Sequence, residues 1–375
     1  MHTRIVHFLS CNKMVVKALC LLLPAATAAL SLSSPRRMLA GVTVGKYSLF
    51  AGGMDGKTDS DAVDIFCDGH LLRTDRLSEA RGLLAATALG DELAFFAGGQ
   101  NHAGNKSAAV DIFNASDGSW SVAALSTPRS MLAASSAAGR FALFAGGELA
   151  EHEGNTSRAD VTDRVDVYDR WSGAWSTAAL VVPRKKLAAT SMGDLAIFGG
   201  GYLSGGGGSR AEWDMFDGAT RAWSAGNLSA SRMRLQAATA GGKALFLGGM
   251  GDACGADCTA VDVFDGASRT WSTPLAGGLT RGRYEFAAVG VGDAVVVAGG
   301  KQNASAGADT GGAWDLVEVF HTATGAWTFR IAPAEARSYV AAAAHTLASG
   351  EQVALVAGGD CQNGTTTALV DVLRA

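Results

Sequence analysis

The amino-acid sequence predicts an all-β fold, a single closed ring of seven small antiparallel sheets, and three observations support this prediction. A Gly doublet after an apolar run recurs seven times over 375 residues, at intervals of 46–59 residues. An Arg precedes each doublet, and a short acidic-apolar run follows it. Gly accounts for 49 residues and Pro for only 6, which suits many tight turns rather than a flexible linker. With 48% hydrophobic and 18% charged residues, the chain is able to bury a sizeable core.

The repeats share landmarks that keep the same order in every copy. The Gly doublets are Gly52/Gly53, Gly98/Gly99, Gly146/Gly147, Gly200/Gly201, Gly248/Gly249, Gly299/Gly300 and Gly358/Gly359. The preceding Arg residues are Arg36, Arg81, Arg129, Arg184, Arg232, Arg283 and Arg337. In five copies an aromatic is followed seven residues later by Trp, in the pairs Phe113/Trp120, Tyr168/Trp175, Phe216/Trp223, Phe264/Trp271 and Phe320/Trp327. Such regular spacing indicates one structural unit repeated along the chain.

Each copy predicts four strands, named a to d in chain order. Strand a is the small-residue run after the Arg, and strand b is the apolar run that ends in the doublet. Strand c is the acidic-apolar run, and strand d begins at the Trp. Turns such as Gly90-Asp91 and Gly292-Asp293 join strands a and b as hairpins. Because the innermost strands of a ring converge on its axis, only small side chains fit on strand a, and we expect the large aromatics farther out between neighbouring sheets.

The Gly doublet, the aromatic–Trp spacing and the Arg that opens each unit resemble kelch repeats, which build β-propellers. The resemblance covers about residues 27–373. It implies that residues 27–375 form one seven-bladed kelch-type β-propeller, in which each blade is a four-stranded sheet. The first repeat departs from the pattern, because Arg73 occupies the place of the Trp.

The two ends of the chain predict how the ring closes. The last repeat stops after strand c, at residues 370–373, so the seventh blade lacks strand d. Residues 27–34 read TAALSLSS and resemble the strand-d segment that precedes Pro128-Arg129 in another repeat. We therefore expect an N-terminal strand to complete the seventh blade and close the ring, which removes two open sheet edges.

Two features predict a secreted or lumenal glycoprotein. Residues 1–26 have the pattern of a signal peptide, and a start at Met14 makes this signal more compact. A buried strand or helix and an uncleaved membrane anchor are the alternatives for this segment, and no later segment resembles a transmembrane helix. The second feature is an excess of N-x-S/T motifs, which are acceptors for N-glycosylation; the alternative is that these motifs occur by coincidence in turn-rich loops. Six of the eight Asn stand in one: Asn105, Asn114, Asn155, Asn227, Asn303 and Asn363.

The predicted topology puts the d–a and b–c connections on one face, together with the Arg residues and the variable loops that follow the doublets. The Arg residues either form an anion site or bind backbone carbonyls between blades, and the second interpretation is favoured. The position two residues after each Arg is apolar in the first three blades and polar in the last four. These polar residues, together with one Arg, are the candidate binding site: Lys186, Arg234, Glu285, Tyr339 and Arg283. Ordinary solvated rim residues are the alternative.

The cysteines predict one short bridge. Cys254 and Cys258 lie four residues apart in one b–c loop, which predicts a local disulfide in an oxidising compartment. A zinc site is the weaker interpretation, because no two further ligands stand nearby. We expect no bridge between Cys67 and Cys361, because the predicted strands place them at opposite faces of neighbouring blades.

The leading functional hypothesis is a monomeric module that binds a protein or a carbohydrate on the d–a/b–c face, without cofactor or metal. A net charge of −4 gives no electrostatic footprint for nucleic acid. The alternatives are an intracellular kelch scaffold and a kelch-type enzyme. A carbohydrate oxidase of the galactose oxidase type needs a Tyr-His pair, and an iron-dependent specifier protein needs an E-x3-D-x3-H motif; the chain has neither. A sugar-isomerising enzyme would use Glu285 with Arg234 or Arg283.

Overall fold

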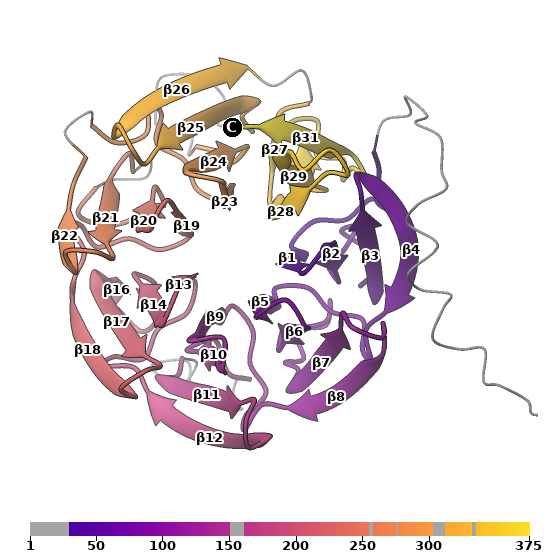
Figure 1. The fold of residues 1–375 in the computed structure, drawn as a ribbon, viewed down its shortest axis with the longest axis horizontal. Helices are drawn as coiled ribbons and strands as arrows, with labels where there is room; N and C mark the ends of the chain where they lie inside the picture. Colours follow the sequence, from indigo (N-terminus) through magenta and orange to yellow (C-terminus); the bar gives the residue numbers. More distant parts are fainter. Residues whose placement is uncertain (1–29, 151–160, 255–257, 275–276, 303–311, 332–334) are drawn as a thin grey trace, which may run out of the picture.

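Seven blades stand in a ring around a central axis, which confirms the predicted seven-bladed β-propeller (Figure 1). The computed structural model describes residues 30–375 apart from 151–160, 255–257, 275–276, 303–311 and 332–334. Its described residues form strands and turns, with no helix among them. Six blades are four-stranded antiparallel sheets, and the seventh has three strands from the C-terminal part of the chain. The predicted signal peptide, residues 1–26, lies outside the described residues.

The two inner strands of each blade carry most of the core. The strands nearest the axis, rich in Ala, Ser, Thr and Gly, are β1 (Ala40–Val44), β5 (Ala85–Leu89), β9 (Ala133–Ala137), β13 (Ala188–Met192), β19 (Gln236–Ala240), β23 (Ala287–Val291) and β28 (Ala341–Thr346). Their apolar partners, almost completely buried, are β2 (Tyr47–Ala51), β6 (Leu93–Ala97), β10 (Phe141–Ala145), β14 (Leu195–Gly199), β20 (Lys243–Leu247), β24 (Ala294–Ala298) and β29 (Gln352–Ala357).

The two outer strands turn from core to solvent. The third strands, each with at least one buried or half-buried acidic residue, are β3 (Ala62–Cys67), β7 (Ala109–Asn114), β11 (Arg164–Asp169), β17 (Glu212–Asp217), β21 (Val261–Asp265), β25 (Leu316–His321) and β31 (Val370–Arg374). The outermost strands are β4 (His70–Arg76), β8 (Trp120–Ala124), β12 (Ala174–Ala179), β18 (Ala222–Asn227), β22 (Thr270–Ser272) and β26 (Ala326–Ile331).

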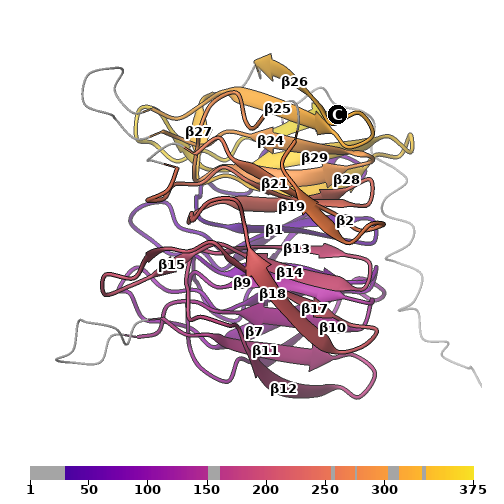
Figure 2. The same cartoon turned by 90° about the vertical axis from the view of Figure 1, so that its left-hand side faces the viewer.

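Two short strand pairs lie in the connections, one within a b–c connection and one between a d–a and a b–c connection. One is the hairpin β15 (Tyr202–Leu203) with β16 (Gly208–Ser209), and the other joins β27 (Arg337–Ser338) to β30 (Asp360–Cys361). Figure 2 shows the ring from the side, with the β15–β16 connection projecting from one face. Both pairs lie on the d–a/b–c face, which we call the loop face.

Aromatic rings fill the seams between neighbouring blades, as the repeat pattern predicts. Tyr47 of the first blade meets Phe113 of the second edge to face, with ring centroids 5.9 Å apart. Phe113 in turn packs on Trp120 at 5.2 Å. The core is continuous around the ring, because each blade buries apolar side chains against the next one, and only the cluster between the sixth and seventh blades lacks an aromatic ring among its described residues.

The first blade corrects one detail of the sequence prediction. Cys67 pairs with His70 across a two-residue turn, and Phe66 pairs with Leu71. The register then shifts between Phe66 and Ile65, so that Ile65 pairs with Arg73. Arg73 is thus not the counterpart of the Trp, because this hairpin turn is shorter than those of the other blades. Its guanidinium lies 5.9 Å from the centroid of the Phe113 ring of the next blade, in a cation–π contact.

A buried ion pair fixes each passage from one blade to the next. Every repeat Arg pairs with the acidic residue of the third strand of its blade: Arg36–Asp64, Arg81–Asp111, Arg129–Asp166, Arg184–Asp214, Arg232–Asp262, Arg283–Glu318 and Arg337–Asp371. The guanidinium groups also donate to backbone carbonyls, for example from Arg129 to Phe144 at 3.0 Å. The Arg residues are therefore structural, as the favoured interpretation expects, but they bind a carboxylate and carbonyls of their own blade rather than carbonyls between blades. In six blades the carboxylate also accepts a backbone N–H from the d–a connection. We call this arrangement the clasp.

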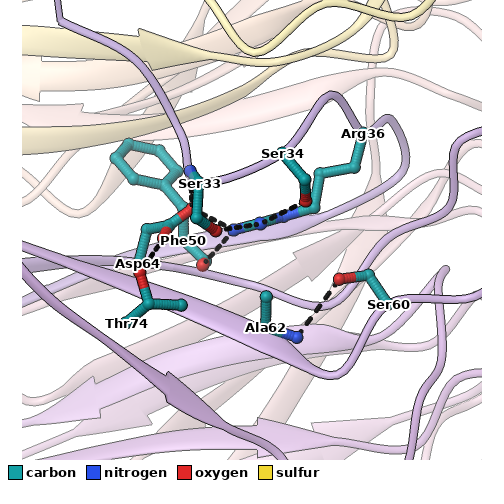
Figure 3. A network of polar contacts seen from close by, with 8 residues as sticks. All are labelled: Ser33, Ser34, Arg36, Phe50, Ser60, Ala62, Asp64 and Thr74. Carbon is teal, nitrogen blue, oxygen red and sulfur yellow. Dashed lines mark hydrogen bonds and ion pairs between the residues drawn. The ribbon is translucent and has the colours of Figure 1, made fainter.

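The clasp of the first blade closes the ring (Figure 3). The Asp64 carboxylate accepts from the Arg36 guanidinium at 2.7 Å, from the Ser33 N–H at 3.0 Å and from the Thr74 hydroxyl at 2.7 Å. Ser33 belongs to the N-terminal segment, so one buried carboxylate ties the start of the chain to the first blade.

The same N-terminal segment pairs with the last strand. The Leu32 N–H donates to the Ala368 carbonyl at 2.7 Å, and the Val370 N–H donates to the Leu30 carbonyl at 2.9 Å. An antiparallel bridge joins Ser31 to Leu369 between them. Residues 30–32 therefore lie on the open side of β31, as the predicted closure requires; residues 27–29 of the predicted strand lie outside the described residues.

A buried histidine joins the seventh blade to the first. His345 of β28 is 2% exposed, and its Nε2 accepts the Gly69 N–H at 2.8 Å while its Nδ1 lies 2.9 Å from the Ser48 hydroxyl. Since Nε2 accepts, the ring is neutral with its hydrogen on Nδ1. Burial lowers the pKa of His345, and the nearby Asp68 carboxylate opposes this shift.

This histidine predicts a loss of stability in mild acid. In the unfolded chain His345 gains a proton as the pH falls below about 6.5, whereas the folded protein takes it up only at lower pH. The unfolded state then binds more protons, so the free energy of unfolding decreases by up to about 1.4 kcal/mol per pH unit in this window. Urea titrations between pH 5 and 8 measure the slope. His345→Gln should reduce it, and an equal slope in both proteins would contradict the assignment.

Candidate binding site at the mouth of the ring

Seven side chains surround the axis on the loop face, one from each blade. They are the residues two positions after each repeat Arg: Met38, Leu83, Met131, Lys186, Arg234, Glu285 and Tyr339. All seven have left-handed backbone conformations, with φ of 54–57°. A left-handed conformation costs a residue with a side chain about 1–2 kcal/mol, and Gly is the residue that avoids this cost. We call these residues the mouth ring.

Backbone hydrogen bonds connect the mouth ring from blade to blade. The Leu83 N–H donates to the Met38 carbonyl at 3.0 Å, and the Met131 N–H donates to the Leu83 carbonyl at 3.1 Å. The same bond recurs from Lys186 to Met131 at 2.9 Å and from Arg234 to Lys186 at 3.0 Å. The left-handed turn thus positions a backbone donor and acceptor between adjacent blades, which gives its cost a structural reason.

The mouth ring lines an open cavity of about 230 Å³. Its first three members form an apolar wall, Met38, Leu83 and Met131, and its last four form a polar wall. The remaining lining residues are Gln236 and four leucines that directly follow ring members: Leu84, Leu132, Leu187 and Leu235. The structure therefore brings together Lys186, Arg234, Glu285 and Tyr339 as the sequence predicts, and faces them with an apolar surface.

Charge in the polar wall is unevenly compensated. The Arg234 guanidinium pairs with the Glu285 carboxylate at 2.8 Å. Among the described residues, Lys186 has no carboxylate within the 4 Å of an ion pair. Burial lowers the pKa of Lys186, and the nearby positive charge of Arg234 adds to the shift. Burial raises the pKa of Glu285, whereas Arg234 opposes that shift.

Lys301 extends the polar wall outward, and the sequence analysis missed it. Its ammonium group donates to the Tyr339 hydroxyl at 3.1 Å and lies 4.4 Å from the centroid of the Tyr339 ring. It also lies 5.4 Å from the centroid of the Tyr284 ring, in a second cation–π contact. The available signal was its position directly after the Gly300 of a doublet, because residues at this position bridge to the residue after the repeat Arg.

The structure does not bring Arg283 to the mouth. Its side chain is fully buried and forms the clasp of the sixth blade with Glu318. It also donates to the backbone carbonyls of Gly299 and Leu316, at 3.1 and 3.0 Å. All its hydrogen-bonding partners therefore belong to the architecture of the blade.

The predicted modification sites are distributed over both faces. Asn105, Asn227 and Asn363 are exposed, and Asn114 is half-buried at the end of β7. Asn155 and Asn303 lie outside the described residues. Cys254 and Cys258 are joined by a disulfide in the loop before β21, as predicted.

Two features are absent from the described part of the chain. Over these residues, no group of three or more His, Cys, Asp or Glu side chains is arranged to hold a metal ion. The same residues include no helix with the length and apolar composition needed to cross a membrane.

Comparison with known proteins supports the fold alone. No protein-family model matches the chain, and no curated protein matches it. Among solved structures, the chain is similar to YjhT, with a TM-score of 0.59 and 14% sequence identity. The match covers 79% of this chain and 98% of YjhT. The kelch character of the repeats therefore stays a prediction from the sequence motifs.

Proposed function

We propose that this protein is a secreted or lumenal kelch-type glycoprotein that binds part of a protein or a carbohydrate at the mouth ring. The observation that carries the proposal is the absence of Gly from seven left-handed positions. Of the described residues, 11 with a side chain have a positive φ, and seven of these are the mouth ring. Gly would avoid the backbone strain at these positions, so the presence of side chains there needs a reason, and a binding role supplies one.

The shape and chemistry of the mouth agree with this role. Binding sites are concave and mostly apolar, with a few convergent polar groups that orient the ligand. The mouth combines an apolar wall with the charged groups of Lys186, Arg234 and Glu285 in one cavity. Its volume of about 230 Å³ is below that of sites for drug-sized molecules, so it would accept one residue or one small group of a larger ligand.

Two observations support a secreted or lumenal location. The N-glycosylation motifs at Asn105, Asn227 and Asn363 are exposed, and Cys254 forms a disulfide with Cys258. If it is right, glycosidase digestion of the native protein lowers its apparent mass. An unchanged mass would instead favour the intracellular scaffold.

Capture from a glycan array and a displayed peptide library tests the binding role. The variant Lys186→Asn removes the ammonium group and keeps a residue that tolerates the left-handed conformation. We expect this variant to bind a captured ligand with about tenfold lower apparent affinity, which is the effect of losing one hydrogen bond to a charged group. The matched control is Arg221→Asn, at an exposed turn between β17 and β18 on the opposite face with φ of 61°. Equal capture by both variants would contradict a site at the mouth.

A further inference from the structure

The mouth ring carries more positive than negative charge. Glu285 is matched by Arg234 at 2.8 Å, whereas Lys186 lacks an ion-pair partner among the described residues. Lys301 lies beside the same wall, where its ammonium group donates to a neutral phenol, that of Tyr339. A ligand that brings one negative charge would balance the wall, and a neutral ligand would not.

The Arg234 guanidinium has donor capacity that is compatible with the same chemistry. The Nε atom of Arg234 is buried and has no hydrogen-bond acceptor among the described residues, although its Nη1 is paired with Glu285. An unpaired buried donor costs about 1–3 kcal/mol, so an acceptor that reached it would be favoured. The planar guanidinium suits a carboxylate, which offers two acceptor oxygens in one plane.

The opposite wall selects for an apolar body. Met38, Leu83 and Met131 line the same cavity as the charged residues, together with four leucines. Methionine side chains adapt their shape to a ligand and make favourable contacts with aromatic rings. A free inorganic anion would leave this surface in contact with water, and a neutral apolar molecule would leave Lys186 unbalanced.

We infer that the mouth ring binds a monocarboxylate with an apolar body, the carboxylate at Lys186 and Arg234 and the body against Met38, Leu83 and Met131. This inference rests on the proposed binding role and specifies its ligand class. A small free acid and a peptide chain end with an apolar last residue share this chemistry. The cavity volume of about 230 Å³ limits the body to a single ring or a short branched chain.

The experiment uses the full chain with ¹³C-labelled methionine methyl groups, because Met38 and Met131 report directly from the apolar wall. The probes are 3-phenylpropionate, its neutral analogue 3-phenylpropanamide, and acetate. We expect 3-phenylpropionate to shift both methyl resonances saturably and to bind about tenfold more tightly than the amide, and acetate to leave the resonances unchanged. Met215, which is buried within the fourth blade, is the internal control.

Two variants at equivalent ring positions separate the two halves of the site. Lys186→Asn should weaken the acid about tenfold and leave the amide unchanged, because only the charge is lost. Leu83→Asn should weaken acid and amide by a similar factor, because it removes apolar surface at the same backbone conformation, φ of 55°. Thermal unfolding of both variants checks that the ring is intact, and the unchanged amide affinity of Lys186→Asn serves the same purpose.

The outcomes are distinguishable. Equal affinity for acid and amide, or a failure of 3-phenylpropionate to shift either methyl group, overturns the ligand class. If a captured glycan or peptide nevertheless shifts the methyl groups of Met38 and Met131, the proposed binding role stands without this ligand class. If no ligand of any kind shifts them, both are wrong. A short peptide ending in phenylalanine, with a free or an amidated terminus, shows whether chain ends also supply the carboxylate.

Discussion

Replacing Asp64 by Ala is expected to lower the free energy of unfolding by about 3–5 kcal/mol. The substitution leaves the Arg36 guanidinium charged and fully buried without its partner. It also removes the acceptor of the Ser33 N–H, which holds the N-terminal segment against the first blade. Urea unfolding followed by tryptophan fluorescence measures the loss. A change below 1 kcal/mol would show that the clasp contributes little.

The equivalent substitution in the fifth blade is the matched control. Asp262→Ala breaks the same clasp with Arg232, and we expect a similar loss of unfolding free energy. Only Asp64→Ala, however, lies where the chain end is held by non-covalent contacts. We therefore expect faster hydrogen exchange at the Leu32 N–H in Asp64→Ala alone. The double variant Arg36→Met with Asp64→Leu should recover much of the stability, because it removes both charges together.

Gly98→Ala is expected to destabilise the protein by about 2–5 kcal/mol, through backbone strain and one lost hydrogen bond. Gly98 has a φ of 64°, and an added Cβ would lie 2.5 Å from the Arg129 carbonyl oxygen of the next blade. That oxygen accepts the Gly99 N–H at 2.9 Å, so moving it away costs a buried hydrogen bond. Thermal and urea unfolding measure the effect.

Gly139→Ala separates strain from contact. Gly139 lies in the turn between β9 and β10 with a φ of 57°, close to that of Gly98, but an added Cβ there would meet no atom within 4 Å. We expect it to cost only the conformational part, about 1–2 kcal/mol. If the two variants were equally stable, the close approach of the doublet to the next blade would not explain its recurrence.

The number and order of the blades could be predicted because the landmarks are local in the sequence. The doublets, the Arg residues and the aromatic–Trp spacing each fit within one repeat. The clasp could be predicted only in part. The acidic residue of strand c was visible, but Asp64 lies 28 residues from Arg36, and only the strand register brings the two together.

The candidate site was predicted by position but not by conformation. Left-handed backbone is usually signalled by Gly, and residues such as Lys186 and Glu285 give no such signal. Arg73 was misassigned because one tight turn moved the register of its hairpin. In both cases a local backbone geometry decides the outcome, and the identities of the neighbouring residues do not reveal it.

The chain of backbone hydrogen bonds between mouth-ring residues has a consequence for how recognition could diversify. The main-chain atoms of Met38 and Leu83 hold the blades in register, so their side chains are not needed for this contact. Substitutions at the apolar positions should therefore leave the backbone arrangement intact, whereas Arg234 and Glu285 form an ion pair and would be exchanged together. Substitutions at these positions alone could therefore change the ligand specificity of such a scaffold without altering the blades.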